Sequence, residues 1–122
     1  SGIFGRLEDQ DLLSEEVSLP VGYKQDVGLG PAVIRCSADG TLKDYDIEII
    51  KADITTDSNK GLVVQVTDPE LLALTGGIVQ GMSGSPIIQN GKLVGAVTHV
   101  FVQDSTKGYG IFLETMMEEG KG

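Results

Sequence analysis

A serine set between glycines, followed by a proline and a hairpin, is the feature that most constrains the fold of this chain. The segment Gly81–Pro86 reads Gly-Met-Ser-Gly-Ser-Pro, and two apolar runs follow it, Ile87–Gln89 and Lys92–His99. They are joined by Asn90-Gly91, the dipeptide that most favours a two-residue turn of type I′. The chain is therefore expected to contain an antiparallel sheet that begins directly after a serine turn.

The spacing of this turn suits acyl transfer. A tetrahedral intermediate needs two backbone amides that converge on one oxygen, and those of Gly81 and Ser83 can supply them. Ser83 is therefore a candidate nucleophile, and Gly81 leaves room for the substrate carbonyl. The strand-to-helix elbow Gly-x-Ser-x-Gly is excluded, because Ser85 occupies the fifth position and Pro86 leads into a hairpin. The alternative is a turn rich in serine and glycine that serves the backbone conformation alone.

The serine segment resembles a known pattern. Gly-x-Ser-Gly-x-Pro, a hairpin with Asn-Gly at its tip, and the run Leu93–Thr98 are together similar to the nucleophile segment of chymotrypsin-fold serine peptidases. The chain departs from that pattern at Met82, where trypsin-like enzymes usually carry aspartate, and at Ser85, where they usually carry glycine. The resemblance implies a six-stranded Greek-key barrel, the second of the two barrels of that fold, which carries the nucleophile.

A more specific resemblance covers most of the chain. The segment Gly77–Pro86, with Thr98–Phe101 and Gly108–Ile111, resembles the SpoIVB peptidase family, signalling serine proteases of endospore-forming bacteria. It implies a protease that is secreted from the forespore into the space between the forespore and mother-cell membranes. The implied substrate is a regulatory membrane-protein complex, whose cleavage releases the processing of a late sigma factor. The resemblance also implies a PDZ-like domain and a signal or membrane segment upstream.

Composition argues against several other classes of function. The formal net charge of −9 opposes the basic surface that phosphate binding requires, so nucleic acid is not expected as a partner, and neither is an anionic membrane surface. One cysteine, Cys36, cannot form an intrachain disulfide, and one histidine, His99, cannot complete a Cys/His zinc cluster. No cofactor or metal is therefore expected, and Cys36 is expected to be a buried or half-buried thiol in an apolar run.

Turn signals and alternation predict a mainly β fold. Apolar or alternating runs between turn residues predict strands at Ala32–Cys36, Tyr45–Ile49, Leu62–Val66, both arms of the serine hairpin, and Tyr109–Leu113. About six or seven strands joined by tight turns favour an antiparallel barrel, in one domain that spans residues 1–122. A C-terminal helix is expected at Glu114–Glu119, and the acidic segment Leu7–Val17 is either a short helix or a solvated loop.

A short helix is expected at residues 69–75, between the third strand and the serine turn. Thr67 or Asp68 can cap its first turn. Pro69 suits the first helical position, and Gly76 suits a left-handed stop. Asp68 therefore has two interpretations: the family resemblance makes it a candidate functional acid in a Thr-Asp-Pro motif, whereas helix capping explains it without chemistry.

Thr98 and His99 are neighbours on the second arm of the hairpin. The resemblance implies that the hydroxyl of Thr98 supports the acid of a catalytic triad, and the alternative is an ordinary β-branched strand residue. Because neighbouring side chains on a strand face opposite sides, His99 points away from the site if Thr98 faces it. We therefore expect His99 to be a structural histidine that faces the core or a partner surface, and not the catalytic base.

The resemblance places the catalytic base outside this sequence. In chymotrypsin-fold peptidases the general-base histidine comes from the first barrel, which precedes the part of the fold that this chain resembles. The chain starts without methionine, and Ile3–Gly5 reads as the middle of a domain, so we expect the C-terminal part of a peptidase domain. The chain alone is then expected to be inactive, with the missing N-terminal barrel of the same protein as its partner. Two other interpretations are a noncatalytic β-barrel binding module and an inactive product of self-processing.

Overall fold

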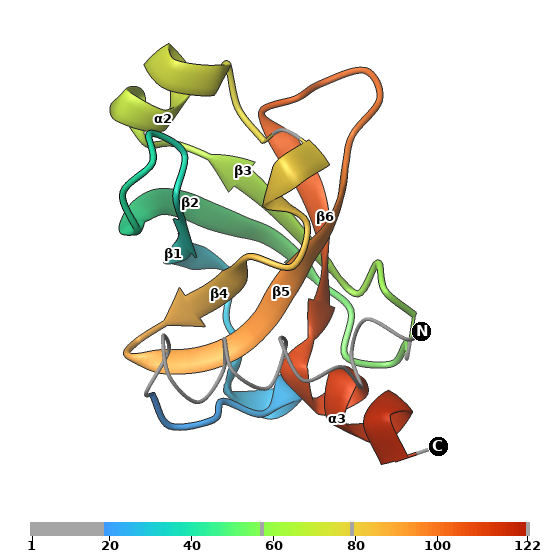
Figure 1. Ribbon diagram of the computed structural model, residues 1–122. Coiled ribbons are helices and arrows are strands. Elements are labelled where there is room, and N and C mark those ends of the chain that lie inside the picture. The colour runs from blue at the N-terminus through green and yellow to red at the C-terminus, as the bar shows by residue number, and fades with distance from the viewer. Residues whose placement is uncertain (1–18, 57, 79, 122) are drawn as a thin grey trace.

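The chain forms a closed antiparallel β-barrel with a helix toward each end (Figure 1). The computed structural model describes residues 19–56, 58–78 and 80–121, so the acidic segment Leu7–Val17 lies outside the described residues. The strands of this part of the chain are β1 (Gly30–Cys36), β2 (Lys43–Ala52), β3 (Leu62–Val66), β4 (Pro86–Gln89), β5 (Lys92–Val100) and β6 (Lys107–Phe112). The helical elements are η2 (Lys24–Asp26), α2 (Pro69–Thr75), η3 (Gln80–Met82) and α3 (Leu113–Lys121).

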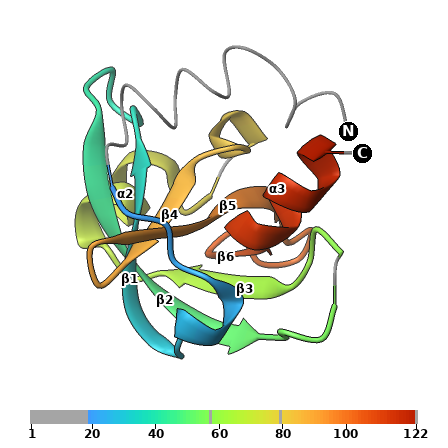
Figure 2. The same ribbon diagram turned by 90° about the horizontal axis from the view of Figure 1, so that it is seen from below.

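The order of the strands around the barrel is β1-β2-β3-β6-β5-β4, and every neighbouring pair is antiparallel. β3 lies beside β6, and β4 closes the barrel against β1, where Ile34 pairs with Ile87. Figure 2 shows the strands arranged around the core, with α3 beside β5 and β6. This non-sequential order is that of a Greek key, and the predicted fold class, an antiparallel barrel with a short helix and a C-terminal helix, is confirmed.

The β4–β5 hairpin forms as the sequence predicts. Asn90 and Gly91 have φ angles of 53° and 75°, the positive values that a type I′ turn requires at both central residues. β4 pairs with β5 from Gln89 opposite Lys92 to Pro86 opposite Ala96. The serine turn directly precedes β4. The register of the hairpin therefore determines which residues of β5 lie next to that turn.

Alternation along β2 places its apolar side chains inside the barrel. Tyr45, Ile47 and Ile49 are buried, whereas Asp46 and Glu48 are exposed. β2 extends beyond the predicted strand at both ends. At its start it pairs with β1, and at its end it continues past a bulge and pairs with β3. The polar face of β2 is therefore part of the outer surface.

Side chains from all six strands fill the barrel. The largest fully buried ones are Tyr45, Phe112, Ile34, Ile47, Ile49, Leu62, Leu71, Ile78, Ile87, Ile111 and Val64. Cys36 is 8% exposed, which confirms the buried thiol. A smaller cluster of Ile88, Leu93 and Leu113 joins α3 to β4 and β5. Burial on this scale, at about 25 cal/mol per Å² of apolar surface, is the main term that stabilises the barrel.

The short helix α2 begins and ends as predicted. Asp68 is its N-cap and accepts hydrogen bonds from the amides of Glu70 and Leu71, and Pro69 is the first helical residue. Gly76 ends the helix with φ of 74°, in the left-handed region, and its amide donates to the carbonyl of Leu72. The predicted span of residues 69–75 is confirmed.

Candidate active site

The serine turn lies between η3 and β4. Ser83 occupies the second position of a four-residue turn that is closed by a hydrogen bond of 3.0 Å from the amide of Ser85 to the carbonyl of Met82. Gly84, in the third position, has φ of 92°, as a type II turn requires. Two hydrogen bonds fix the turn to β5, from the amide of Gly84 to the carbonyl of Val97 (2.7 Å) and from the amide of Val97 to the carbonyl of Ser85 (2.9 Å).

Burial separates Ser83 from its neighbours. Met82 and Ser85 are 5% and 8% exposed, whereas Ser83 is exposed. The side chain of Met82 belongs to the hydrophobic core, so the residue before the serine anchors the turn by apolar packing. A nucleophile must be accessible to substrate, and of the two serines in the motif Ser83 meets this condition.

The hydroxyl of Ser83 is tied to the end of β5. It donates to the carbonyl of Thr98 at 3.2 Å, and the hydroxyl of Thr98 donates to the carbonyl of Asn59 at 2.6 Å. Ser83, Thr98 and the loop before β3 are therefore connected by hydrogen bonds. A serine that donates to a carbonyl has no base to take its proton, so this arrangement positions the hydroxyl without activating it.

The conformation of η3 decides where the amides of the turn point. In a 3₁₀ helix each amide points toward the carbonyl three residues before it. By this pattern the amide of Ser83, which follows η3 directly, points back toward the carbonyl of Gln80. η3 packs against β5 and is the gold turn that precedes β4 in Figure 1. An amide that points back along the chain in this way is not directed at a substrate oxygen, so in this form the Ser83 amide does not serve as an oxyanion donor.

The end of β5 has an open edge beside Ser83. Pairing with β4 stops at Ala96, whereas β5 continues to Val100 and pairs there with β6. The amide of Phe101 donates to β6 at Lys107, and backbone directions alternate along a strand, so the polar groups of Val100 face away from β6. Among the described strands, none covers this edge, which is the geometry that an extended peptide needs to add as a further strand.

His99 lies beside a bulge in β5. The register between β5 and β6 shifts between Val97 and His99, and alternation does not hold across a bulge. His99 is exposed, so of the two expected surroundings, the core and a partner surface, the core is excluded, and its side chain lines a surface pocket with Tyr109. No hydrogen bond joins His99 to Ser83 in the described part of the chain.

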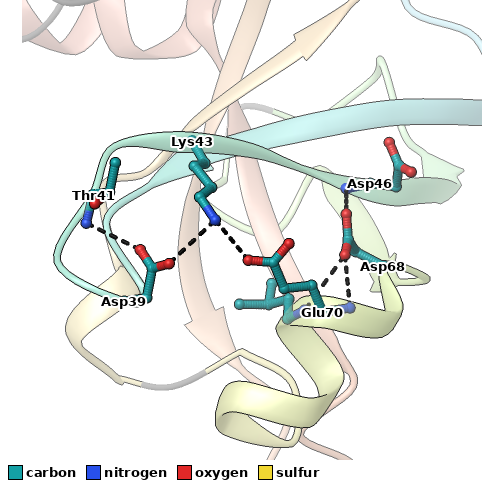
Figure 3. A network of polar contacts seen from close by, with 7 residues as sticks. Asp39, Thr41, Lys43, Asp46, Asp68 and Glu70 are labelled. Atoms are coloured by element: carbon teal, nitrogen blue, oxygen red, sulfur yellow. Dashed lines mark hydrogen bonds and ion pairs between the residues drawn. The ribbon is translucent and has the colours of Figure 1, made fainter.

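Asp68 uses both carboxylate oxygens to hold the backbone together (Figure 3). One oxygen accepts from the amides of Glu70 at 2.9 Å and Leu71 at 3.4 Å, and the other accepts from the amide of Asp46 on β2 at 2.9 Å. The Asp46 amide, followed by the two helix amides, holds the pKa of the Asp68 carboxyl below its ordinary value, against the opposing effect of partial burial. Asp68 thus ties the start of α2 to β2.

A lysine next to this cap links the same two elements. Figure 3 shows Lys43 between Asp39 and Glu70, with Nζ at 3.2 Å from the first carboxylate and 2.7 Å from the second. The hydrogen bonds to these carboxylates, that of Glu70 first, raise the pKa of the Lys43 ammonium above its ordinary value. All three side chains are partly open to water, so the ion pairs contribute little net stability. They belong to the docking of α2 and not to the serine turn.

Two further observations concern the described residues only. They contain no group of three or more histidine, cysteine, aspartate or glutamate side chains that could hold a metal ion. None of their helices is long and apolar enough to cross a membrane.

The comparison with protein families decides the affiliation of the chain. The family model described as SpoIVB peptidase S55 matches residues 1–117. This chain belongs to the SpoIVB peptidase S55 family. No curated protein and no solved structure matched it in the corresponding searches. The S55 assignment supports a protease of sporulation, and the resemblance deduced from the serine segment is confirmed at the level of the family.

The S55 chain brings some of its predicted site residues together and not others. Ser83 and Thr98 are in direct contact through the Thr98 carbonyl, and Gly81 lies in η3 just before them. Asp68 is bonded to α2 and β2, and no hydrogen bond links it to Ser83 among the described residues. Asn59 is a contact that sequence reasoning missed, because it reaches Thr98 from a loop 39 positions away in the chain. No local pattern signals such a tertiary contact.

Replacing Asp68 distinguishes its capping role from a catalytic one. Asp68→Ala is expected to lower the free energy of unfolding of the S55 chain by about 1 kcal/mol, because two helix amides and the Asp46 amide lose their acceptor. Asp68→Asn retains an acceptor oxygen and should cost less. Urea unfolding at neutral pH, followed by circular dichroism, measures both changes.

The pH dependence gives a second test of the same residue. The folded pKa of Asp68 is depressed, so its contribution to stability is present above the unfolded pKa of about 3.9 and is lost as pH falls through the folded pKa. Asp68→Asn should therefore flatten the loss of stability between neutral and strongly acidic pH. A large fall in kcat of the intact protease, with unfolding and its pH profile unchanged, would instead support the acid role.

Proposed function

We propose that this chain carries the nucleophile of a serine endopeptidase of chymotrypsin-like fold, with Ser83 as the nucleophile. The observation that carries the proposal is the position of Ser83, whose exposed hydroxyl lies on a turn fixed to the sheet, next to the open edge of β5. A peptide that adds to this edge would present a carbonyl carbon to the hydroxyl. The membership in a peptidase family is consistent with this assignment.

The proposed chemistry is acyl transfer. Ser83 Oγ attacks the carbonyl carbon of the scissile bond while its proton passes to a general base, and the carbonyl oxygen becomes an oxyanion. The amides of Gly81 and Ser83 stabilise that oxyanion, the amine departs with the proton from the base, and water then hydrolyses the acyl-enzyme. Thr98 is proposed to support the acid of the triad. Asp68 remains a second proposed acid, with the capping contacts described above as the competing explanation.

The machinery is proposed to be incomplete in this chain in two ways. The general-base histidine would be supplied by an N-terminal barrel of the same protein, since the hydroxyl of Ser83 is bonded in this chain to a carbonyl. The 3₁₀ turn of η3 is proposed as a resting form, in which the amide of Ser83 is turned back along the chain. Docking of the N-terminal barrel would then have to unwind η3 before the two amides converge.

The proposed biological role follows from the family. The substrate would be a regulatory membrane-protein complex, and its cleavage would release processing of a late sigma factor. The site of action would be the space between the forespore and mother-cell membranes, after secretion from the forespore. The net charge of −9 is consistent with a protein substrate and disfavours nucleic acid as a partner.

Labelling with a fluorophosphonate tests the proposal. This probe reacts with a serine only when a base activates the hydroxyl, so the intact protein is expected to be labelled at Ser83. Peptide mass spectrometry locates the adduct, and Ser83→Ala is the matched control that should remove it. A modification at Ser85 would contradict the assignment. The absence of labelling in a folded protein that still binds peptide would favour the second candidate function, a noncatalytic binding module. The observation that favours this candidate is that the hydroxyl of Ser83 donates to a carbonyl and not to a base.

A further inference from the structure

A surface pocket lies at the end of β5. Its volume is about 440 Å³, and its walls are formed by the end of β5, the loop that follows it, β6, and Lys60 from the turn before β3. No part of the proposed acyl-transfer chemistry uses these side chains. The pocket is therefore a separate feature that requires its own explanation.

Two hydrogen bonds connect this pocket to Ser83. Ser83 Oγ donates to the carbonyl of Thr98, and the next residue, His99, lines the pocket. The hydroxyl of Thr98 donates to the carbonyl of Asn59, and the next residue, Lys60, also lines the pocket. His99 and Lys60 are thus each one residue away from a group that is hydrogen-bonded to Ser83, either directly or through Thr98.

The direction of β5 determines which part of a substrate would enter the pocket. A peptide added antiparallel to β5 runs from Val100 toward Thr98 and reaches Ser83 at its scissile bond. Residues on the N-terminal side of that bond therefore lie along Thr98–Val100. The pocket lining includes His99 and Val100 from this stretch of β5, so we infer that side chains of the acyl half of the substrate reach it.

Two aromatic residues line the pocket. The rings of Phe101 and Tyr109 lie 4.6 Å apart between centroids at an angle of 34°, and both residues are partly buried. Val100 and the fully exposed Val102 add apolar surface to the lining. Such a surface favours the methylene groups of a substrate side chain, because their contact removes apolar area from water.

Lys60 brings a positive charge to the pocket. Lys60 Nζ lies 5.1 Å from the centroid of the Tyr109 ring, a cation–π contact. Among the described residues, Lys60 makes no ion pair. By contrast, Arg35 is paired with Asp44, Lys43 with Asp39 and Glu70, and Lys107 with Asp104. In a chain with a net charge of −9, an ammonium that has no ion-pair partner among the described residues and lies beside an aromatic ring favours an anionic ligand.

We propose that this pocket selects an acidic side chain, glutamate best, on the N-terminal side of the bond that Ser83 cleaves, with Lys60 as the residue that determines this specificity. The methylenes of the glutamate pack on Phe101 and Tyr109, and its carboxylate binds Lys60. This proposal rests on the proposed peptidase function, because it describes the substrate of the same site. It goes beyond that function by naming a side-chain class and the residue that recognises it.

Peptide binding to the intact protein with Ser83→Ala tests this selection without cleavage. The probes are fluorescein-labelled eight-residue peptides of alanine, valine and serine, with one glutamate, glutamine or lysine at each position in turn. Fluorescence anisotropy is expected to show about threefold to fivefold tighter binding of the best glutamate peptide than of its glutamine counterpart, the size typical of an exposed ion pair. The difference should shrink as salt is raised.

Matched variants assign the preference to one residue. Lys60→Gln is expected to abolish the preference for glutamate, and Lys60→Glu to reverse it in favour of the lysine peptide. Lys92→Gln, at the far end of β5, removes a lysine outside the pocket and should leave the preference intact. Lys60 is exposed, so these variants should fold, and circular dichroism checks this.

Several outcomes would overturn the proposal. Equal affinity for glutamate and glutamine peptides at every position would do so, as would a preference that survives Lys60→Gln, or the absence of binding by all peptides at millimolar concentration. The result is independent of whether Ser83 is a nucleophile, since the binding protein lacks that hydroxyl. Conversely, fluorophosphonate labelling reports on Ser83 whatever Lys60 binds, so the two proposals fail separately.

Discussion

Ser83→Ala in the intact protease is expected to reduce kcat on the order of 10⁶-fold, whereas Ser85→Ala should retain activity within several-fold. The two serines are two positions apart and compete for the role of nucleophile. Ser83 is exposed and donates to the carbonyl of Thr98, whereas Ser85 is 8% exposed and its backbone is bonded to Val97. Removing Ser83 Oγ removes the reacting atom. Removing the buried hydroxyl of Ser85 should cost about 1 kcal/mol of stability and little chemistry.

The comparison requires equal amounts of folded enzyme. Initial rates of cleavage are measured for both variants and the wild type at matched folded concentration, which thermal unfolding establishes for each protein. The backbone conformation also favours Ser83 over Ser85 as the nucleophile, because Pro86 restricts Ser85 to an extended conformation that leads into β4. Activity that survives in Ser83→Ala and disappears in Ser85→Ala would reverse the assignment and remove the chymotrypsin-like alignment with it.

Local rules predicted the parts of the fold that local interactions determine. Asn90-Gly91 specifies its turn through the φ angles that these two residues tolerate. The α2 boundaries follow from Asp68, Pro69 and Gly76, each of which satisfies or terminates helix hydrogen bonds within a few residues. The strand periodicity of β2 follows from burial on one face. In these cases the residues that determine the structure lie within a few positions of one another in the sequence.

The candidate site was predicted less completely, because its decisive contacts are tertiary. The bulge beside His99 belongs to the pairing of β5 with β6, and no local pattern in the sequence signals it. The third hydrogen bond of Asp68 comes from Asp46 on β2, which no capping rule includes. Lys60 meets Tyr109 across 49 positions of the sequence. Such contacts follow from the closed order of strands, so they become visible only once the barrel is built.

The 122-residue chain by itself is expected to hydrolyse no peptide above background. A serine hydroxyl is a weak nucleophile unless a base accepts its proton, and deletion of a triad member elsewhere removes several orders of magnitude in rate. In this chain the hydroxyl of Ser83 donates to the carbonyl of Thr98, and the single histidine, His99, makes no hydrogen bond to it among the described residues. The turn of η3 adds a second obstacle, because the amide of Ser83 points toward Gln80. Incubation of the purified chain with a fluorogenic peptide mixture measures the rate.

The chain with Ser83→Ala and the chain with His99→Gln are the controls that give this result its meaning. His99 is exposed, so its replacement should leave folding intact, and a loss of hydrolysis in both variants would identify a base within this chain and contradict the proposal of an external one. If the chain is inactive as expected, adding the N-terminal barrel of the same protein in trans should restore hydrolysis and fluorophosphonate labelling together. Restoration requires both a base and an unwound η3, because either deficiency alone leaves the transition state without proton transfer or without its oxyanion donors. Labelling without turnover after the N-terminal barrel is added would distinguish the two deficiencies. It would show that a base is in place while the oxyanion site is still closed.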